Sequence, residues 1–362
     1  MDKSLLDLYS DYLLSSFGST PATRLSELLQ GAISHDRITR FLSEDVPRSK
    51  DLWHIVKRHV REIESSDGIM TIDDSIEEKP YTDENDIVCW HYNHARGCQT
   101  KGINFMTVLY SSKKTSLPVG FQIIAKTETY MEAKTNTEKR CSPTSKNTYY
   151  QRLLQACVRN TIPFRYVIND VWYASAENMM FVERTLKKHF VMPLKSNRKV
   201  ALSRTDKRQG KYQTVETLVF KKDKTVRGIY LEGVDFPLLL AKQIFANEDG
   251  SMGVLYLVTS DTTLTYERMT TLYRTRWHVE EYHKSLKQNA SLEKSPTRTV
   301  ATQTTHFFAA LCAYCKLEML KVSTHMNHSA LKLSIYMQAL MTAYEQLRSL
   351  QPIRFSNKML FA

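Results

Sequence analysis

The order of strand-like and helix-like segments between residues 67 and 196 constrains the fold of this chain more than any other feature. Apolar runs and β-branched residues mark the strands, and longer stretches with helical periodicity separate the later ones. In chain order the segments are three strands, a helix, a strand, a helix and a strand. They span residues 69–73, 103–112, 119–127, 145–160, 164–170, 175–189 and 190–196. This order predicts an α/β fold, a mixed sheet with helices on both faces.

The first 66 residues show only helical patterns. Ser34 is placed to cap a short helix at 35–43, on which Arg37 and Arg40 stand apart from the apolar residues. Short helices joined by a tight turn are typical of helix-turn-helix DNA-binding units. We therefore predict a helical DNA-binding domain over residues 1–66. The alternative is a helical cap packed on the larger domain.

The second half of the chain interrupts the core and then resumes it. Residues 197–262 are rich in strand and turn residues, as in 212–220, and predict a β-rich insertion subdomain. The core is expected to resume over residues 263–300. Residues 301–362 end the chain with two helices, broken near His325–His328.

Composition restricts the class of partner. The chain has 362 residues and a formal net charge of +12, which favours a polyanionic partner such as double-stranded DNA. No apolar run reaches the roughly 18 residues that a membrane span needs, so no membrane association is expected. The six cysteines are scattered and the first residues do not resemble a signal peptide, which predicts reduced thiols in a cytoplasm. Glycine-rich phosphate loops are absent, and this argues against a nucleotide cofactor.

Two acidic residues directly follow predicted strands, and a third lies on a predicted helix. Asp73 follows one predicted buried strand and Asp170 follows another, and Glu280 lies on a predicted helix. Strand ends are rigid places where α/β sites form. Oxygen ligands of this kind suit Mg²⁺ or Mn²⁺, and two such ions can bridge one phosphodiester. An aspartate at a strand end is also a common turn former, so each residue alone is weak support for a site.

Residues 271–288 combine basic, aromatic and acidic side chains on one predicted helix. At about 100° per residue, six of them fall within an arc of roughly 100°. These are Tyr273, Arg276, Trp277, Glu280, Lys284 and Lys287. The arc predicts a face that contacts DNA, with arginine and lysine on phosphates and an aromatic ring on an unstacked base. An ion-paired surface beside core aromatics is the alternative.

The spacing Tyr273-x2-Arg276-x3-Glu280-x6-Lys287 resembles the Y-R-E-K signature of bacterial insertion-sequence transposases of the DDE class. It occurs here after a β-rich insertion, as in that family. The resemblance implies an RNase H-like catalytic core and a DNA transposase, with DNA recombination as its activity. A metal-dependent nuclease that cleaves without joining, and an inactive DNA-binding protein, are the rival functions.

Two further segments, 70–80 and 165–178, resemble the parts of that family that carry its two aspartates. The resemblance covers roughly residues 65–320. The first aspartate of the family matches either Asp73 or Asp74. Asp73 is favoured, because Asp74 would point to the opposite face if the strand continues.

The resemblance also implies roles for individual residues. The metal-binding catalytic triad would be Asp73, Asp170 and Glu280, holding two Mg²⁺ ions that Mn²⁺ can replace. Contacts to DNA at the transposon ends would come from Tyr273, Arg276 and Lys287, and Trp277 could stack on a displaced base. The expected reaction is cut-and-paste transposition from terminal inverted repeats. It implies a homodimer on paired ends, associated with a bacterial nucleoid. Whether a DNA hairpin forms stays open.

For each of the other motifs, a purely structural role is the alternative to a functional one. The spacing of Cys89, His91, His94 and Cys98 invites a zinc site but is irregular for known fingers. Two packed thiols are the expected state of Cys312 and Cys315. His283 could orient a carboxylate, contact DNA or simply lie on the surface. The remaining basic residues could line a DNA path or form a solvated face: Lys187, Lys188, Lys195 and Arg198.

Overall fold

A computed structural model of the chain describes residues 1–93, 96–133, 136–220, 226–246 and 249–350. The α-helices are α1 (Lys3–Ser15), α2 (Ala22–Leu28), α3 (His35–Glu44), α4 (Ser49–Ile63), α5 (Lys146–Arg159), α6 (Ala176–Met180), α7 (Arg204–Arg208), α8 (Tyr266–Arg274), α9 (Trp277–Gln288), α10 (Val300–Thr324) and α11 (His328–Leu350). The strands are β1 (Ile69–Glu78), β2 (Val88–Asn93), β3 (Cys98–Ser112), β4 (Thr115–Ile123), β5 (Glu128–Glu132), β6 (Thr137–Cys141), β7 (Tyr166–Asn169), β8 (His189–Leu194), β9 (Lys199–Ala201), β10 (Gln213–Thr214), β11 (Val226–Leu231), β12 (Leu238–Ala246) and β13 (Met252–Thr259).

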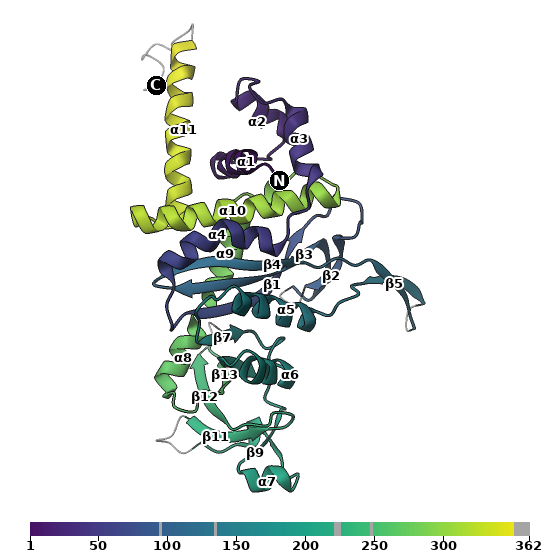
Figure 1. Cartoon of the computed structure of the whole chain (residues 1–362), viewed down its shortest axis with the longest axis vertical. Coiled ribbons are helices and arrows are strands. Elements are labelled where there is room, and N and C mark those ends of the chain that lie inside the picture. Colours follow the sequence, from purple (N-terminus) through teal and green to yellow (C-terminus); the bar gives the residue numbers. More distant parts are fainter. Residues whose placement is uncertain (94–95, 134–135, 221–225, 247–248, 351–362) are drawn as a thin grey trace, which may run out of the picture.

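Five strands form the centre of the sheet in the order β4-β3-β1-β7-β8. The first three are joined antiparallel, whereas β1 pairs with β7 and β7 with β8 in parallel. Helices cover both faces: Phe105 of β3 packs against Phe307 of α10, and Gly120 of β4 lies under Leu153 of α5. This confirms the predicted RNase H-like mixed sheet flanked by helices (Figure 1).

The strands between residues 199 and 259 continue this sheet. β13 pairs antiparallel with β8, and the order then runs outward through β12, β11, β9 and β10. Within 212–220, one of the stretches rich in strand and turn residues, only Gln213–Thr214 pair as a strand. The amides of Val215 and Glu216 bond instead to carbonyls of a preceding loop, at Arg198 and Ser196, and a 3₁₀ turn results.

The N-terminal helices pack on elements from the far end of the sequence. α1 and α3 both contact α10, and α4 packs on β4. Tyr9 of α1 donates a hydrogen bond to His306 of α10, and both side chains are buried. Figure 1 shows α10 lying between the sheet and the first three helices.

Two elements project from this body in Figure 1: the β5–β6 hairpin and α11. The break between α10 and α11 falls where the sequence predicts it, and His325 ends α10 in the left-handed conformation with φ 59°. Over the residues that the structure describes, no helix is both long enough and apolar enough to span a bilayer.

Candidate active site

The parallel pairing of β1 with β7 brings two aspartates side by side. The register joins Ile72 to Asn169, so Asp73 and Asp170 are the next residues on adjacent strands. Neighbouring strands lie about 4.8 Å apart. The Asp170 carboxylate also accepts hydrogen bonds from the amides of Trp172 and Tyr173, at 2.9 and 3.4 Å, which hold the turn after β7. The fold thus gives both carboxylates a rigid backbone and a common direction.

Burial and mutual repulsion disfavour ionisation of this pair. Burial, with the charges of Asp170 and Asp74, raises the pKa of Asp73 to about 8. Burial also raises the pKa of Asp170, against the pull of its two amide hydrogen bonds. Carboxylates crowded in this way are stabilised by a nearby cation.

The neighbouring Asp74 has a different environment. Its carboxylate accepts hydrogen bonds from Asn104 of β3 at 2.9 Å, from Lys146 of α5 at 2.7 Å and from the Tyr173 hydroxyl. Burial alone would raise the pKa of Asp74, but Lys146 and these hydrogen bonds hold it below its ordinary value. Asp74 is therefore ionised and hydrogen-bonded to three side chains, on the side of β1 that faces α5.

The segment predicted as a single helix over 271–288 is two helices, and this prediction is corrected. α8 ends at Arg274 and α9 begins at Trp277, with i to i−3 hydrogen bonds across Thr275 and Arg276. The Thr275 hydroxyl donates to the Leu272 carbonyl at 2.6 Å. A side chain that competes for a backbone carbonyl in this way bends a helix. Tyr273 therefore sits before the bend, and the other residues of the predicted arc follow it.

Arg276 lies among the carboxylates. Its guanidinium donates to Glu280 at 2.5 Å, and its charge lowers the pKa of both Asp73 and Asp170 against the effect of their burial. The Tyr273 ring lies 6.0 Å from the guanidinium, and burial raises the pKa of the Tyr273 hydroxyl to about 12. Asp73, Asp170, Glu280, Arg276 and Tyr273 thus form one site at the junction of β1, β7 and the α8–α9 bend.

Two contacts fix α9 against the sheet. Lys287 donates to the Ile76 carbonyl of β1 at 2.7 Å, and the His283 ring lies 3.5 Å from the Thr107 hydroxyl. Burial and the charge of Lys287 lower the pKa of His283 to about 3, so its ring is neutral. His283 is thus a packed helix residue that holds α9 in place beside Asp73.

The donor set fits a divalent cation. Three carboxyl groups beside one guanidinium make an oxygen-rich, partly buried site, which suits Mg²⁺ once the carboxyl groups are ionised. Within the described ranges, no three acidic, histidine or cysteine side chains are close enough to share one ion. The Glu280 carboxylate is bonded to Arg276, and it would have to turn toward the aspartates to share an ion with them.

The other predicted DNA-contacting residues lie around or away from this site. Trp277 is 58% exposed at the start of α9. Lys284 lines a separate hollow of about 520 Å³ between α9, α10 and α11. Arg37 and Arg40 are exposed on α3, which packs on α10, and Arg37 lies 3.5 Å from Asp2.

Four residues at the site were not anticipated from the sequence: Asn104, Lys146, Trp172 and Tyr173. Tyr173 and Trp172 follow Asp170 closely, and that proximity was the available signal. Lys195 lies 5.4 Å from the Trp172 ring, and with Arg198 it lines a hollow of about 310 Å³.

The possible zinc motif does not come together among the described residues. Cys89 is buried and its thiol contacts the Asn85 carbonyl, Cys98 is exposed, and His94 lies outside the described residues. Cys312 and Cys315 are both buried in α10, and burial raises the pKa of Cys312 to about 12.

Two known protein families match long stretches of the chain. A family described as "Transposase DDE domain" matches residues 136–316, and one described as "DDE superfamily endonuclease" matches residues 2–219. The first match includes Asp170 and Glu280, and the second includes Asp73 and Asp170. No curated protein was found to match the chain.

Proposed function

The chain belongs to the DDE superfamily of transposases and endonucleases, and from this membership we propose that it moves DNA by a cut-and-paste reaction. Enzymes of this superfamily bind DNA and process it with divalent metal ions, generally Mg²⁺. The proposed reaction cuts at terminal inverted repeats by hydrolysis and joins the freed 3′-hydroxyls to target DNA. A homodimer would hold the two ends together.

The observation that carries this proposal is the pairing of Asp73 with Asp170 on adjacent parallel strands, facing Arg276. We assign Asp73, Asp170 and Glu280 as the metal-binding catalytic residues. Two bound ions would supply the charge that activates water and stabilises the leaving oxygen. To complete the set, Glu280 would leave its partner Arg276 and turn toward the aspartates, and the Arg276 guanidinium would then be available to a DNA phosphate.

Residues around the site would orient the DNA. Arg276 offers a planar fork to a phosphate and the Tyr273 hydroxyl a further donor beside it. Lys287 and Lys284 add positive charge along α9, and the exposed Trp277 ring can stack on an unpaired base. Arg276, Tyr273 and Trp277 are proposed for the DNA strand nearest the metal site, whereas Lys284, at the separate hollow, would contact DNA farther from it.

We divide the chain by role at the predicted bounds. Residues 1–66 would bind the terminal repeats through Arg37 and Arg40, and residues 197–262 would add further DNA contacts. The catalytic core would comprise 67–196 and 263–300. Residues 301–362 form the C-terminal part, of which 351–362 lie outside the described residues.

The test uses duplexes that carry the two junctions of the element, with Mg²⁺ or with EDTA, and products resolved on a denaturing gel. Wild type should nick and then join in Mg²⁺, whereas Glu280→Gln and Asp170→Asn should do neither. Glu281→Gln, on the adjacent exposed position of α9, is the matched control and should retain activity. Metal-dependent nicking without joined products would favour an endonuclease. Cutting by Glu280→Gln at the wild-type rate would remove Glu280 from the site.

A further inference from the structure

Helix α9 carries Glu280, and it is held from two opposite sides. On one side, Lys287 and His283 contact strands β1 and β3 of the sheet. At about 100° per residue, Ser285 lies roughly 180° around the helix from these two residues. The Ser285 side chain is buried and faces α11. The helix is therefore held between the sheet and the C-terminal helices.

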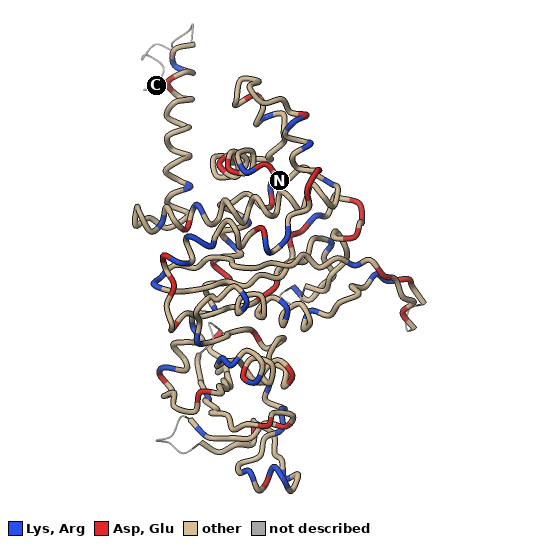
Figure 2. Tube along the Cα trace, in the orientation of Figure 1, with Lys and Arg blue, Asp and Glu red and all other residues tan. Residues whose placement is uncertain are grey.

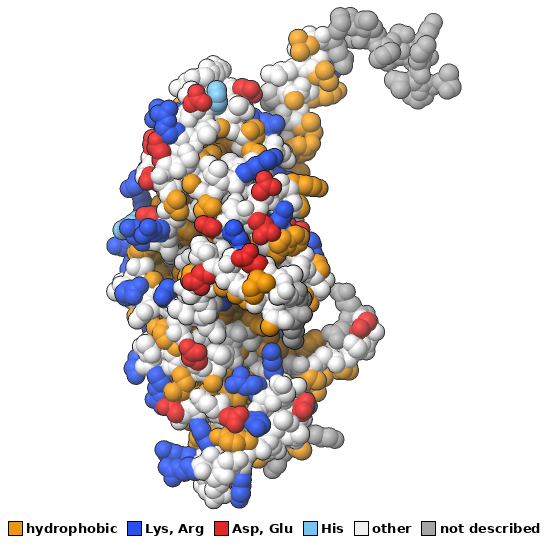
Figure 3. Space-filling view, turned by 90° about the vertical axis from the view of Figure 1, so that its right-hand side faces the viewer, with side chains coloured by type: hydrophobic (Ala, Val, Ile, Leu, Met, Phe, Trp, Pro, Cys, Tyr) orange, Lys and Arg blue, Asp and Glu red, His pale blue; other side chains and the backbone are white. Residues whose placement is uncertain are grey.

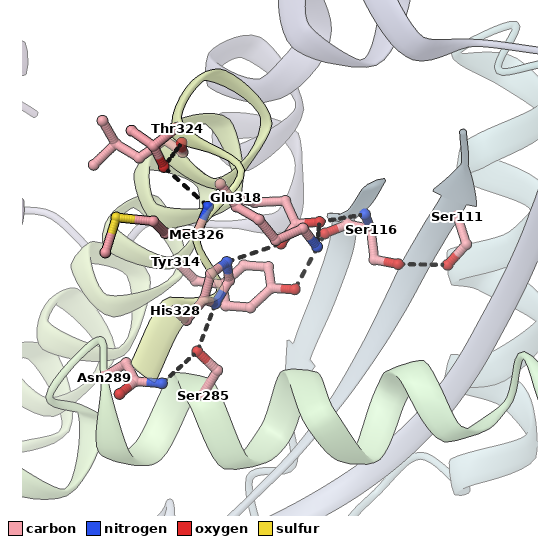
Figure 4. A network of polar contacts seen from close by, with 11 residues as sticks. Ser111, Ser116, Ser285, Asn289, Tyr314, Glu318, Thr324, Met326 and His328 are labelled. Atoms are coloured by element: carbon pink, nitrogen blue, oxygen red, sulfur yellow. Dashed lines mark hydrogen bonds and ion pairs between the residues drawn. The ribbon is translucent and has the colours of Figure 1, made fainter. Parts of the chain in front are cut away.

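A buried carboxylate lies at the centre of the contacts on this second side. Glu318 of α10 is only 1% exposed, and it accepts hydrogen bonds from the Ser116 amide of β4 at 2.9 Å and from Lys321 at 2.6 Å (Figure 4). Its other oxygen lies 2.9 Å from His328 Nε2. Burial alone would raise the pKa of Glu318, but these partners hold it below its ordinary value. A buried anion held in this way has a fixed position, because the loss of a partner would leave its charge uncompensated.

His328, the first residue of α11, connects this carboxylate to α9. Its Nδ1 atom lies 2.7 Å from the Ser285 hydroxyl, which also accepts a hydrogen bond from Asn289 at 3.0 Å (Figure 4). The His328 side chain is only 10% exposed. Ser285, His328 and Glu318 thus join α9, α11 and α10 in one series of contacts, which we call the polar tie.

The polar tie stands where α11 attaches to the body of the protein. The charged residues of α10 are Lys316, Glu318 and Lys321, all towards its C-terminal end, and Figure 2 shows the rest of this helix without charge. Beyond its base, α11 projects from the body and carries exposed apolar side chains (Figure 3). The tie is therefore a localised polar contact between largely apolar helices.

The other end of α9 is held less firmly. α9 begins directly after the bend at Thr275, where i to i−3 hydrogen bonds cross from one helix to the next. Glu280 lies between this bend and Ser285, about 7.5 Å before Ser285 along the helix axis. The direction in which Glu280 points therefore depends on the contacts that hold α9 beyond it, on the sheet and at the polar tie.

We propose that Ser285, His328 and Glu318 are positioning residues for the Glu280 carboxylate. By holding α9 against the sheet, the polar tie keeps Glu280 within reach of the two aspartates when it leaves Arg276. The inference rests on the proposed function, in which Glu280 completes the metal site. In this role the three residues of the tie touch neither metal nor DNA, and they act only through the orientation of α9.

The first test measures backbone hydrogen exchange in the full chain without metal or DNA. Ser285→Ala removes the bond to α9 and leaves the Glu318–His328 pair in place. Exchange of the amides of residues 277–283 should become about fivefold faster or more, because α9 is then held from the sheet side alone. Ser285→Thr keeps the hydroxyl and should exchange as wild type does. Unchanged exchange, or faster exchange confined to residues 284–289, would overturn the proposal.

The second test measures nicking in Mg²⁺ of a duplex that carries a single element end. Ser285→Ala should lower kcat about tenfold and leave KM for the duplex within about twofold, because orientation and not DNA binding is lost. Ser285→Thr should restore kcat. Ser329→Ala, at an exposed serine in the same turn of α11 as His328, is the matched control and should nick as wild type does. A Ser285→Ala enzyme with the wild-type kcat would also overturn the proposal.

A double-mutant cycle tests whether His328 acts through Ser285. His328→Ala should lower kcat as Ser285→Ala does, and the combined variant should lose about tenfold rather than about 100-fold, because both changes break one tie. Losses that multiply would contradict a shared tie. Circular dichroism checks that each variant is folded at the assay temperature. If wild type does not nick in Mg²⁺, the proposed function fails, whereas hydrogen exchange still decides whether the polar tie orients α9.

Discussion

At the scale of single residues, Asp73 and its neighbour Asp74 are opposites. Asp73 is crowded by other carboxylates, whereas Asp74 is held by Lys146, Tyr173 and Asn104. Asp170 follows the end of β7 as the sequence pattern predicts, but Asp73 was wrongly expected at a strand end: it lies within β1, which continues to Glu78 because these residues keep pairing with β3. The partners of Asp74 do not follow from the sequence pattern, because the β1–β3 register and the packing of α5 bring them in from 30 to 99 residues away.

The two aspartates should respond differently to removal of charge. The folded-state pKa of Asp73 lies above 3.8, so its contribution to stability falls as pH rises from about 4 to about 8. Asp73→Asn should therefore raise the free energy of unfolding at pH 7 by roughly 1–3 kcal/mol and abolish cleavage. Asp74→Asn should lower it by roughly 1–2 kcal/mol. Urea unfolding in EDTA measures both. If Asp74→Asn were instead more stable than wild type, Asp74 rather than Asp73 would be the aspartate whose charge destabilises the fold.

His306 predicts an acid sensitivity. Its ring nitrogens face the Tyr9 hydroxyl and the Ser291 carbonyl, and burial lowers its pKa to about 4. The pKa of His306 is lower in the folded state than the 6.5 of the unfolded state. The stabilisation that neutral His306 gives the fold is therefore complete above pH 6.5 and is lost as the pH falls toward 4. The loss should reach roughly 3 kcal/mol.

Unfolding free energies of wild type and His306→Gln, measured between pH 7.5 and 4.5, check this expectation. The variant should be less stable at pH 7.5, and the difference should shrink as the pH falls. A constant difference across the range would show that His306 does not titrate on unfolding. His91 and His283, with pKa values also lowered, stay in both proteins and cancel in the comparison.

At the scale of elements, hydrophobic periodicity predicts most strands and helices of the core in their order, but it does not predict β2, Val88–Asn93, which pairs with β3. The bend between α8 and α9 is not predicted either, because it depends on one hydroxyl, that of Thr275, competing for a carbonyl. The β5–β6 hairpin was also missed, since its residues are mostly exposed and carry no apolar alternation. Exposed pairing of this kind leaves little pattern in a sequence.

The close contact of β1 with β3 depends on Gly102. A Cβ added there would stand 2.2 Å from the Glu77 carbonyl oxygen, which belongs to the backbone and cannot yield. Gly102→Ala should lower the free energy of unfolding by roughly 2–4 kcal/mol. Gly228→Ala, in β11, meets no atom within 4 Å and should be neutral or stabilising by about 0.4–1 kcal/mol. Thermal unfolding compares the two, and equal melting temperatures would contradict the prediction.

At the scale of the whole molecule, the net charge of +12 predicts strongly salt-dependent DNA binding. Affinity for a duplex should fall about 10³-fold or more between 50 and 200 mM salt. If α3 contacts phosphates, Arg37→Ala with Arg40→Ala should reduce the slope of log affinity against log salt by about two. Arg58→Ala, on the exposed side of α4, is the control. Fluorescence anisotropy gives the slopes, and an unchanged slope in the double variant would exclude α3 from the DNA contact.

The packing of α1 on α10 also bears on how the protein is made. α1 is complete after residue 15, but its partner begins at residue 300. At a synthesis rate of about 5–20 residues per second, the apolar side of α1 stays uncovered for roughly 15–60 s until α10 is synthesised. α1 thus reaches its final packing only after most of the residues described here have been synthesised. A chain that stops before α10 leaves that side bare, and should aggregate or be degraded rather than persist as a DNA-binding fragment.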